Sequence, residues 1–238
     1  MSRAPTGDAD RGRVAHTTSI PLPRAVLFDL DGTLSDSLPD IHAALDAARR
    51  ELGLTGVTPS QVRGWVGCGA AMLVARSLGH EDEASPEVLR VLARFLGIYE
   101  EHPDDRSVLY PGVADLLDRL RTRGVRLAVT TNKPGRAAEA LLRGLGVFDR
   151  FDAVVTPDAA GVRKPDPAFM RCALERLGVG ASDAIVVGDG LPDLAAARGA
   201  GVRCVAVLGG YGDRAALLAQ RPEWTVESVA DLLGRFAW

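Results

Sequence analysis

The stretch VLFDLDGTLSDS, residues Val26–Ser37, ends an apolar run with two acids. Asp29 and Asp31 alternate with Leu30, so their side chains begin on the same side of an extended chain. A carboxylate at the edge of a hydrophobic core is costly unless something pairs with it. Two interpretations follow: the acids stabilise a turn at Gly32, or they hold a cation and take part in catalysis.

Apolar runs elsewhere in the chain predict buried strands at residues 25–30, 125–131, 151–156, 184–189 and 202–208, with a weaker one at 223–226. These runs are almost continuously apolar, as strands covered on both faces must be. Segments with helical periodicity lie between or after these apolar runs, at residues 112–124, 135–146, 165–178, 192–201 and 227–236. This alternation predicts an α/β fold, with a Rossmann-like parallel sheet and helices on both faces.

Residues 37–105 interrupt the alternation of strands and helices. Helical patterns occur at residues 40–52, about 70–78 and 86–101, without a convincing strand. Because structureless loops of this length are uncommon, we expect an inserted all-helical cap domain rather than a long irregular crossover. Asp36 and Asp40 are expected at a helix start, where acids suit the helix dipole.

The predicted core domain comprises residues 24–36 and 106–238. Residues 1–23 show no hydrophobic periodicity and predict a disordered leader. The net charge of −3 provides no basic field for nucleic acid, and no apolar run approaches the ~20 residues of a membrane span. The three cysteines are far apart and form no CxxC pair, which suits a reducing cytoplasm. Whether the protein is a monomer or a homodimer stays open.

Lysine is rare in this chain. Of 28 basic residues, only Lys133 and Lys164 are lysines, and the others are arginines. Codon bias accounts for the general excess of arginine but not for these two exceptions. A compact ammonium group differs chemically from a guanidinium fork, so both positions are candidates for a specific role. For Lys133 the alternatives are a solvated loop charge and a position near the substrate.

Polar side chains follow the predicted strands at the edge where open parallel sheets bind ligands. They are Asp29, Asp31, Thr131, Asn132, Lys133, Lys164, Asp189 and Asp193; Asp158 is assigned to a turn. The carboxylates would repel one another without a cation, and hard oxygen ligands suit Mg²⁺ beside a phosphate. The lysines, threonine and asparagine can hold an anion. The set predicts a phosphoryl-transfer site.

Two closely spaced acids can divide the chemistry of such a site. One can attack phosphorus and form an aspartyl-phosphate, and the other can protonate the leaving alkoxide and then activate water. Gly32 lets backbone amides approach the transferred group. Lys164 would offset negative charge, and Pro165 restricts its backbone.

Four segments, DLDGTLSDS, TTNK, KPDP and GDGLPD, resemble in order the signature motifs of the haloacid dehalogenase superfamily of phosphatases. The resemblance runs from about Arg24 to Leu208, with the helical insertion where that family places its cap. The segments GWVGCGAAMLVARSLG, LYPGVADLL, LAVTTNKP and VGDGLPDLAAARGAG are similar to those of phosphoglycolate phosphatases.

The resemblance implies a role for each acid. Asp29 is the nucleophile and a magnesium ligand. Asp31 is the general acid and base, and its backbone carbonyl is a further ligand. Asp189 binds magnesium, and Asp193 orders the metal's water shell or the motif lysine.

The remaining motif residues are assigned in the same way. Thr131 and the Asn132 amide hold phosphoryl oxygens, and Lys164 is the motif lysine. Two positions depart from the family pattern: Gly190 stands where relatives often have serine or threonine, and Cys68 where phosphoglycolate phosphatases often have asparagine. The second departure bears on the substrate more than on the chemistry.

The loop GWVGCG in the insertion contains Trp65, Gly67 and Cys68. It is either a glycine-rich helix entry with Trp65 in the core of the cap, or a loop that binds substrate; one loop can do both. Whether Arg63 or Arg76 meets a substrate carboxylate stays open.

The leading hypothesis is a magnesium-dependent phosphatase that acts on a small phosphorylated metabolite, with 2-phosphoglycolate the best candidate. A pyrophosphatase or nucleotidase of the same superfamily is the closest alternative, and a phosphosugar mutase fits less well. A phosphonate hydrolase would need a lysine in the cap, which residues 37–105 lack. A non-catalytic binding protein would be expected to lose Asp29, Lys164 or Asp189, and all three are present.

Overall fold

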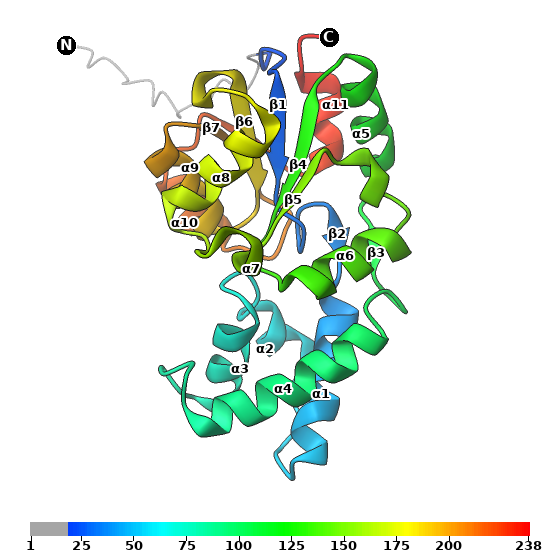
Figure 1. The fold of residues 1–238 in the computed structure, drawn as a ribbon, viewed down its shortest axis with the longest axis vertical. Coiled ribbons are helices and arrows are strands. Elements are labelled where there is room, and N and C mark those ends of the chain that lie inside the picture. The colour runs from blue at the N-terminus through cyan, green and yellow to red at the C-terminus, as the bar shows by residue number, and fades with distance from the viewer. Residues whose placement is uncertain (1–18) are drawn as a thin grey trace, which may run out of the picture.

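A computed structural model describes residues 19–238. Six parallel strands form one sheet in the order β5-β4-β1-β6-β7-β8 (Figure 1). The strands are β1 (Ala25–Phe28), β4 (Arg126–Thr130), β5 (Ala153–Val155), β6 (Ala184–Gly188), β7 (Arg203–Val207) and β8 (Trp224–Val226). The predicted parallel α/β sheet is confirmed. Strand β1 ends at Phe28, so Asp29 and Asp31 lie in the loop after it and not on the strand itself.

Helices cover both faces of the sheet, as the apolar strands require. Val26 and Phe28 of β1 join one hydrophobic cluster, and Ala25 and Leu27 join the other. The first cluster contains residues of α5 (Val113–Thr122), α6 (Gly135–Gly144) and α11 (Leu232–Arg235). The second contains residues of α8 (Pro167–Leu177), α9 (Leu191–Ala200) and α10 (Arg214–Ala219).

Four helices form the helical insertion, which lies beyond the carboxyl edge of the sheet (Figure 1). They are α1 (Leu38–Glu51), α2 (Pro59–Arg63), α3 (Ala70–Leu78) and α4 (Pro86–Glu101), and their buried apolar residues form a third cluster. Helix α2 has no counterpart among the predicted helices, because five residues are too few to show periodicity. A capping box between Thr58 and Gln61 starts it. The domain limits remain a prediction.

Two linker segments connect the insertion to the sheet, and they are joined to each other. Strands β2 (Ser35–Asp36) and β3 (Val108–Leu109) pair antiparallel at the two ends of the insertion. Asp40, in the first turn of α1 as expected, accepts hydrogen bonds from the backbone N–H groups of Arg106 and Ser107 and from Ser107 Oγ. Asp36 lies in β2 instead of at a helix start.

Several short elements differ from the sequence-based prediction or were not predicted. In place of one helix over residues 227–236, the chain forms a 3₁₀ turn and α11, with Asp231 capping the turn. That 3₁₀ turn is η3 (Val229–Asp231), and the other short helices are η1 (Phe148–Arg150), α7 (Pro157–Ala160) and η2 (Ala181–Asp183).

The end of the predicted leader, residues 19–23, is part of the fold. Ile20 is buried in the first cluster and forms a β-bridge with Phe236. Ile20 and Leu22, which also packs against this cluster, are too few to give a periodic pattern, which explains why the sequence did not indicate this contact. The rest of the leader lies outside the described residues. Within residues 19–238, no helix combines the length and apolarity needed to cross a membrane.

Replacing Asp40 by alanine should destabilise the fold. The change leaves the backbone N–H groups of Arg106 and Ser107 without their acceptor and removes one of the two acceptors of the Ser107 hydroxyl. We expect the free energy of unfolding to fall by about 2–3 kcal/mol, measured by urea denaturation with tryptophan fluorescence. The exposed Asp149 is the control, since its replacement by alanine should change little. Equal unfolding midpoints for the two variants would contradict the assigned role.

Candidate active site

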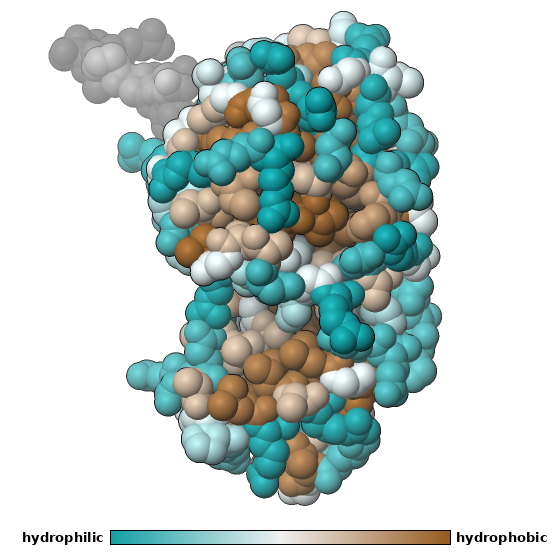
Figure 2. All heavy atoms as spheres, in the orientation of Figure 1, coloured by the Kyte–Doolittle hydropathy of each residue, from teal (hydrophilic) through white to brown (hydrophobic). Residues whose placement is uncertain are grey.

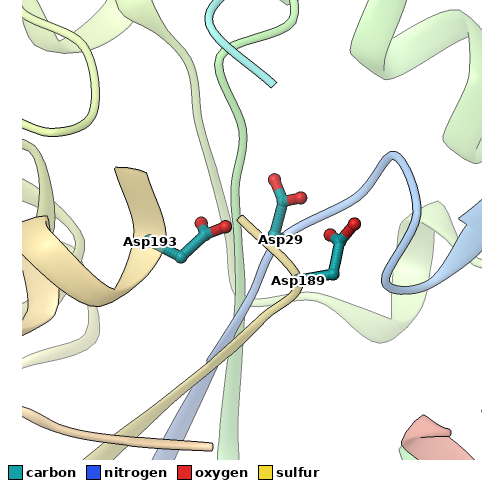
Figure 3. Close-up of side chains that lie close together, drawn as sticks. All are labelled: Asp29, Asp189 and Asp193. Atoms are coloured by element: carbon teal, nitrogen blue, oxygen red, sulfur yellow. The ribbon is translucent and has the colours of Figure 1, made fainter. Parts of the chain in front are cut away.

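Three carboxylates converge where the ends of neighbouring strands meet. Because β1 lies between β4 and β6, the loops after these strands are adjacent. Asp29 follows β1, Asp189 follows β6, and Asp193 lies in the first turn of α9 (Figure 3). All three are buried, and each offers an oxygen such that these atoms lie within 4.8 Å of one another.

The buried ammonium of Lys164 links this acid cluster. Its Nζ donates to Asp29 Oδ1 at 2.7 Å and to Asp193 Oδ1 at 2.6 Å. A third hydrogen bond reaches the backbone carbonyl of Thr130 at 2.7 Å. Three acceptors match the three donors of an ammonium group. Lys164 therefore connects the carboxyl ends of β1 and β4 with the first turn of α9, which follows β6.

The acid cluster carries more negative charge than Lys164 balances. Burial raises the pKa of Asp29 well above its ordinary value, because Lys164 only partly opposes burial and the other two acids add to it. Burial and Asp193 raise the pKa of Asp189 to about 6. Burial lowers the pKa of Lys164, but the carboxylates outweigh it and the net change is upward. Three buried carboxylates around one ammonium are a donor set that suits a hard divalent cation.

Asp189 is held by Thr33, which follows the first strand at the same edge but was given no role, and by Tyr211, which the sequence analysis did not assign to the site. Thr33 Oγ1 donates to Asp189 Oδ1 at 2.7 Å, and the backbone N–H of Tyr211 donates to Asp189 Oδ2 at 2.6 Å. Thr33 could have been found from the sequence, because it lies two residues after Asp31. Tyr211 could not, because it lies in a loop without a periodic pattern. Gly32 has a φ of 90°, and a Cβ there would collide with the Asp189 carboxylate and the Tyr211 ring.

Tyr211 also reaches the first linker segment. Its hydroxyl accepts hydrogen bonds from the backbone N–H groups of Ser37 and Leu38, each at 2.9 Å, and donates to Asp36 at 2.8 Å. One residue thus contacts an acid of the cluster through its backbone and the start of the helical insertion through its side chain.

Asp31 and Lys133 form a separate pair. Lys133 Nζ donates to Asp31 Oδ1 at 2.9 Å and Oδ2 at 3.1 Å. Lys133 is buried, so it is not the solvated loop charge that was one of its two interpretations. Burial lowers the pKa of Lys133, but Asp31 and Tyr99 more than compensate. The Ser37 hydroxyl also donates to Asp31.

The residues expected to hold phosphoryl oxygens lie beside Lys164. Thr131 is buried, and its Oγ1 accepts a hydrogen bond from the backbone N–H of Lys133. The Asn132 side chain donates to the carbonyls of Gly67 and Lys164 and accepts from the Lys164 N–H. The side-chain amide of Asn132 therefore positions Lys164 and the insertion loop.

Two openings between the sheet and the helical insertion are both lined in part by Asp29 and Asp31. Figure 2 shows the surface hollowed between these two parts of the molecule. Gly67 lines both openings, and Cys68 lines the second. Trp65 packs against the core of the insertion and belongs to neither lining set.

The two insertion arginines have different surroundings. Arg63 donates to the carbonyl of Gly210, and its guanidinium lies 5.1 Å from the centre of the Tyr211 ring, so it is engaged with a loop of the core. Arg76 is exposed, lines the second opening and contacts Cys68 Sγ at 3.6 Å. Gly190, the other departure from the family pattern, donates its N–H to Asp193 Oδ2.

Comparison with known proteins places the chain in a family. The model for haloacid dehalogenase-like hydrolases matches residues 23–201. A phosphoglycolate phosphatase from Rhodospirillum rubrum is 45% identical over 196 residues, covering 80% of this chain and 81% of that protein.

Solved structures agree with this assignment. A predicted phosphoglycolate phosphatase from Haemophilus somnus has a TM-score of 0.80 at 28% identity, covering 90% of this chain and 97% of that one. CbbY from Rhodobacter sphaeroides in complex with xylulose-(1,5)bisphosphate has a TM-score of 0.75 at 28% identity, covering 90% of this chain and 99% of that one. The chain belongs to the haloacid dehalogenase-like hydrolases, as its four motifs indicated, and it is a phosphoric monoester hydrolase.

Proposed function

We propose that this enzyme is a magnesium-dependent phosphatase that hydrolyses a small phosphate monoester, with 2-phosphoglycolate as the substrate, through an aspartyl-phosphate on Asp29. The observation that carries the proposal is the acid cluster: Asp29, Asp189 and Asp193 within 4.8 Å, with Lys164 bound to two of them. A nucleophile, a cation site and a charge-balancing ammonium are then adjacent.

The proposed reaction uses two acids in turn. The Asp29 carboxylate attacks phosphorus, and the bond from phosphorus to the alkoxide oxygen breaks. Asp31 gives its proton to that alkoxide and then takes a proton from the water that attacks the aspartyl-phosphate. Phosphate leaves, and Asp29 is restored as a carboxylate. Thr131 Oγ1 and the backbone N–H of Asn132 would hold phosphoryl oxygens, since the Asn132 side chain is already bonded.

Magnesium would be held by the carboxylates of Asp29 and Asp189 and by the backbone carbonyl of Asp31. Asp193 accepts from Lys164 and from the Gly190 N–H, which supports a positioning role for it in preference to direct ligation. When bound, the cation supplies positive charge that offsets the acids and the phosphoryl oxygens.

The position of Arg76 favours a substrate that carries a second anionic group besides the phosphate. The residues that line the second opening include several acids and a single basic residue, Arg76. Lys133 and Arg63 are engaged by Asp31 and by Gly210. This supports Arg76 as the cation that would bind the carboxylate of 2-phosphoglycolate. The helical insertion covers the opposite side of the gap and would exclude bulk water.

Replacing Asp29 by asparagine removes the nucleophile. We expect wild-type enzyme with Mg²⁺ to release phosphate from 2-phosphoglycolate, with the highest kcat/KM in a panel that includes pyrophosphate, nucleoside monophosphates, hexose phosphates and xylulose-1,5-bisphosphate. Asp29→Asn should lower kcat at least ~10³-fold, measured by phosphate release.

Asp158→Asn is the matched control for this variant. Asp158 is exposed, and its Oδ1, which an asparagine retains, accepts from the Gly135 N–H. Its activity should stay close to wild type. Turnover that persists in pure Asp29→Asn protein would exclude Asp29 as nucleophile, and a panel without any phosphate release would exclude the proposed function.

Protons should compete with magnesium for the acid cluster. Because the pKa of Asp189 is raised to about 6, the folded metal-free protein holds a proton that the unfolded chain has released. The binding of this proton stabilises the metal-free fold fully below about pH 4, and the stabilisation is lost as the pH rises through about 6. Magnesium affinity should fall roughly fourfold or more from about pH 7.5 to about pH 5.5. Thermal unfolding with EDTA or Mg²⁺ measures both effects; equal gains in Tm from Mg²⁺ at both pH values would contradict the prediction.

Replacing Thr33 by valine keeps the shape of the side chain and removes the hydroxyl that donates to Asp189. We expect the affinity for Mg²⁺ to fall about 10-fold or more, because a ligand that loses its outer hydrogen-bond partner is held less well. Isothermal titration of metal-free protein with Mg²⁺ provides the measurement. Thr33→Ser retains a hydroxyl and should bind Mg²⁺ nearly as wild type does. Equal affinities for the two variants would show that the hydroxyl has no effect.

A further inference from the structure

Lys133 occupies a position that the proposed reaction does not explain. Its ammonium contacts both oxygens of Asp31, at 2.9 and 3.1 Å, and lies 4.5 Å from the centre of the Tyr99 ring. All contacts are buried or partly buried. An ammonium over an aromatic face is attracted by the ring, and most strongly where water is excluded.

The three partners come from separate parts of the fold. Asp31 lies in the loop after β1, Lys133 in the loop between β4 and α6, and Tyr99 in α4 of the helical insertion. The hydroxyl of Ser37, at the start of the insertion, is a further donor to Asp31. The carboxylate of Asp31 is therefore fixed by groups that depend on the position of the insertion.

The two lysines of the chain divide the acids between them. Lys164 donates to Asp29 and Asp193, and Lys133 donates to Asp31. All other basic residues are arginines, whose wide fork suits two parallel acceptors rather than a compact position between a carboxylate and a ring. Lysine at residue 133 thus matches a compact, buried position.

We propose that Lys133 is a positioning residue that holds the Asp31 carboxylate on the leaving-group side of the site, with Tyr99 of the insertion completing its contacts. The inference rests on the proposed role of Asp31 as general acid and base. When Asp31 gives its proton to the leaving alkoxide, it becomes a carboxylate, and the ammonium of Lys133 stabilises that charge. Lys133 keeps its own protons in both steps.

Lys133→Met tests this role, because methionine keeps an unbranched chain and removes the charge. Two small substrates separate the possible effects. Glycolate leaves 2-phosphoglycolate as an alkoxide that needs a proton, whereas acetate leaves acetyl phosphate without one. In single-turnover measurements, Lys133→Met should slow glycolate release about 10²-fold and change acetate release less than about threefold. Circular dichroism confirms that the variant is folded.

A second comparison does not depend on the stability of Lys133→Met. In Asp31→Asn protein, Lys133 has lost its charged partner, so adding Lys133→Met should slow glycolate release by less than about twofold. Tyr99→Leu should slow glycolate release about 3- to 10-fold, and Tyr99→Phe, which keeps the ring, should remain near wild type.

The outcomes separate this inference from the proposed function. Equal slowing of glycolate and acetate release in Lys133→Met would show that Lys133 acts on the phosphoryl group or on the stability of the fold. Unchanged rates for both substrates would show that Lys133 has no role in the reaction. Either result overturns the inference. A wild-type enzyme that releases neither product would instead overturn the proposed function. A further large loss when Lys133→Met is added to Asp31→Asn would show that Lys133 does not act through Asp31.

Discussion

The ammonium of Lys164 is the contact on which the geometry of the site depends. It bonds to Asp29 after β1, to the Thr130 carbonyl at the end of β4 and to Asp193 in the first turn of α9, three segments that are far apart in sequence. Buried carboxylates without a partner are costly, so the acid cluster could not be assembled at this depth without a cation among its members. Because all three donors of the ammonium are used, the same contact that neutralises part of the charge also fixes the spacing of the loops.

The main elements of the fold could be predicted because their physical cause is visible in the sequence. Strands buried on both faces must be apolar at every position, and the residues of β1 do alternate between two hydrophobic clusters. The short elements could not be predicted in this way. Helix α2 is defined by one capping box, and Ile20 joins the core through a single side chain, so neither produces a repeating pattern.

The candidate site could be predicted only where the topology itself brings residues together. The carboxyl ends of parallel strands meet at one edge, so the motifs indicated that Asp29, Lys164 and Asp189 would gather. The hydrogen bonds that orient them could not be inferred, because they come from loops whose paths depend on packing. Tyr211 follows Asp189 by 22 residues and returns to it through a backbone N–H. Every residue except proline has a backbone N–H group, so the residue type at position 211 does not reveal this hydrogen bond.

Tyr211 contacts both the acid cluster and the start of the helical insertion. Its backbone binds Asp189, and its hydroxyl bonds to Ser37 and Leu38 at the start of the helical insertion. A rotation of the insertion that pulls on these linker amides also strains the loop that orients Asp189. The orientation of Asp189 and the tilt of the insertion are then linked through a single residue.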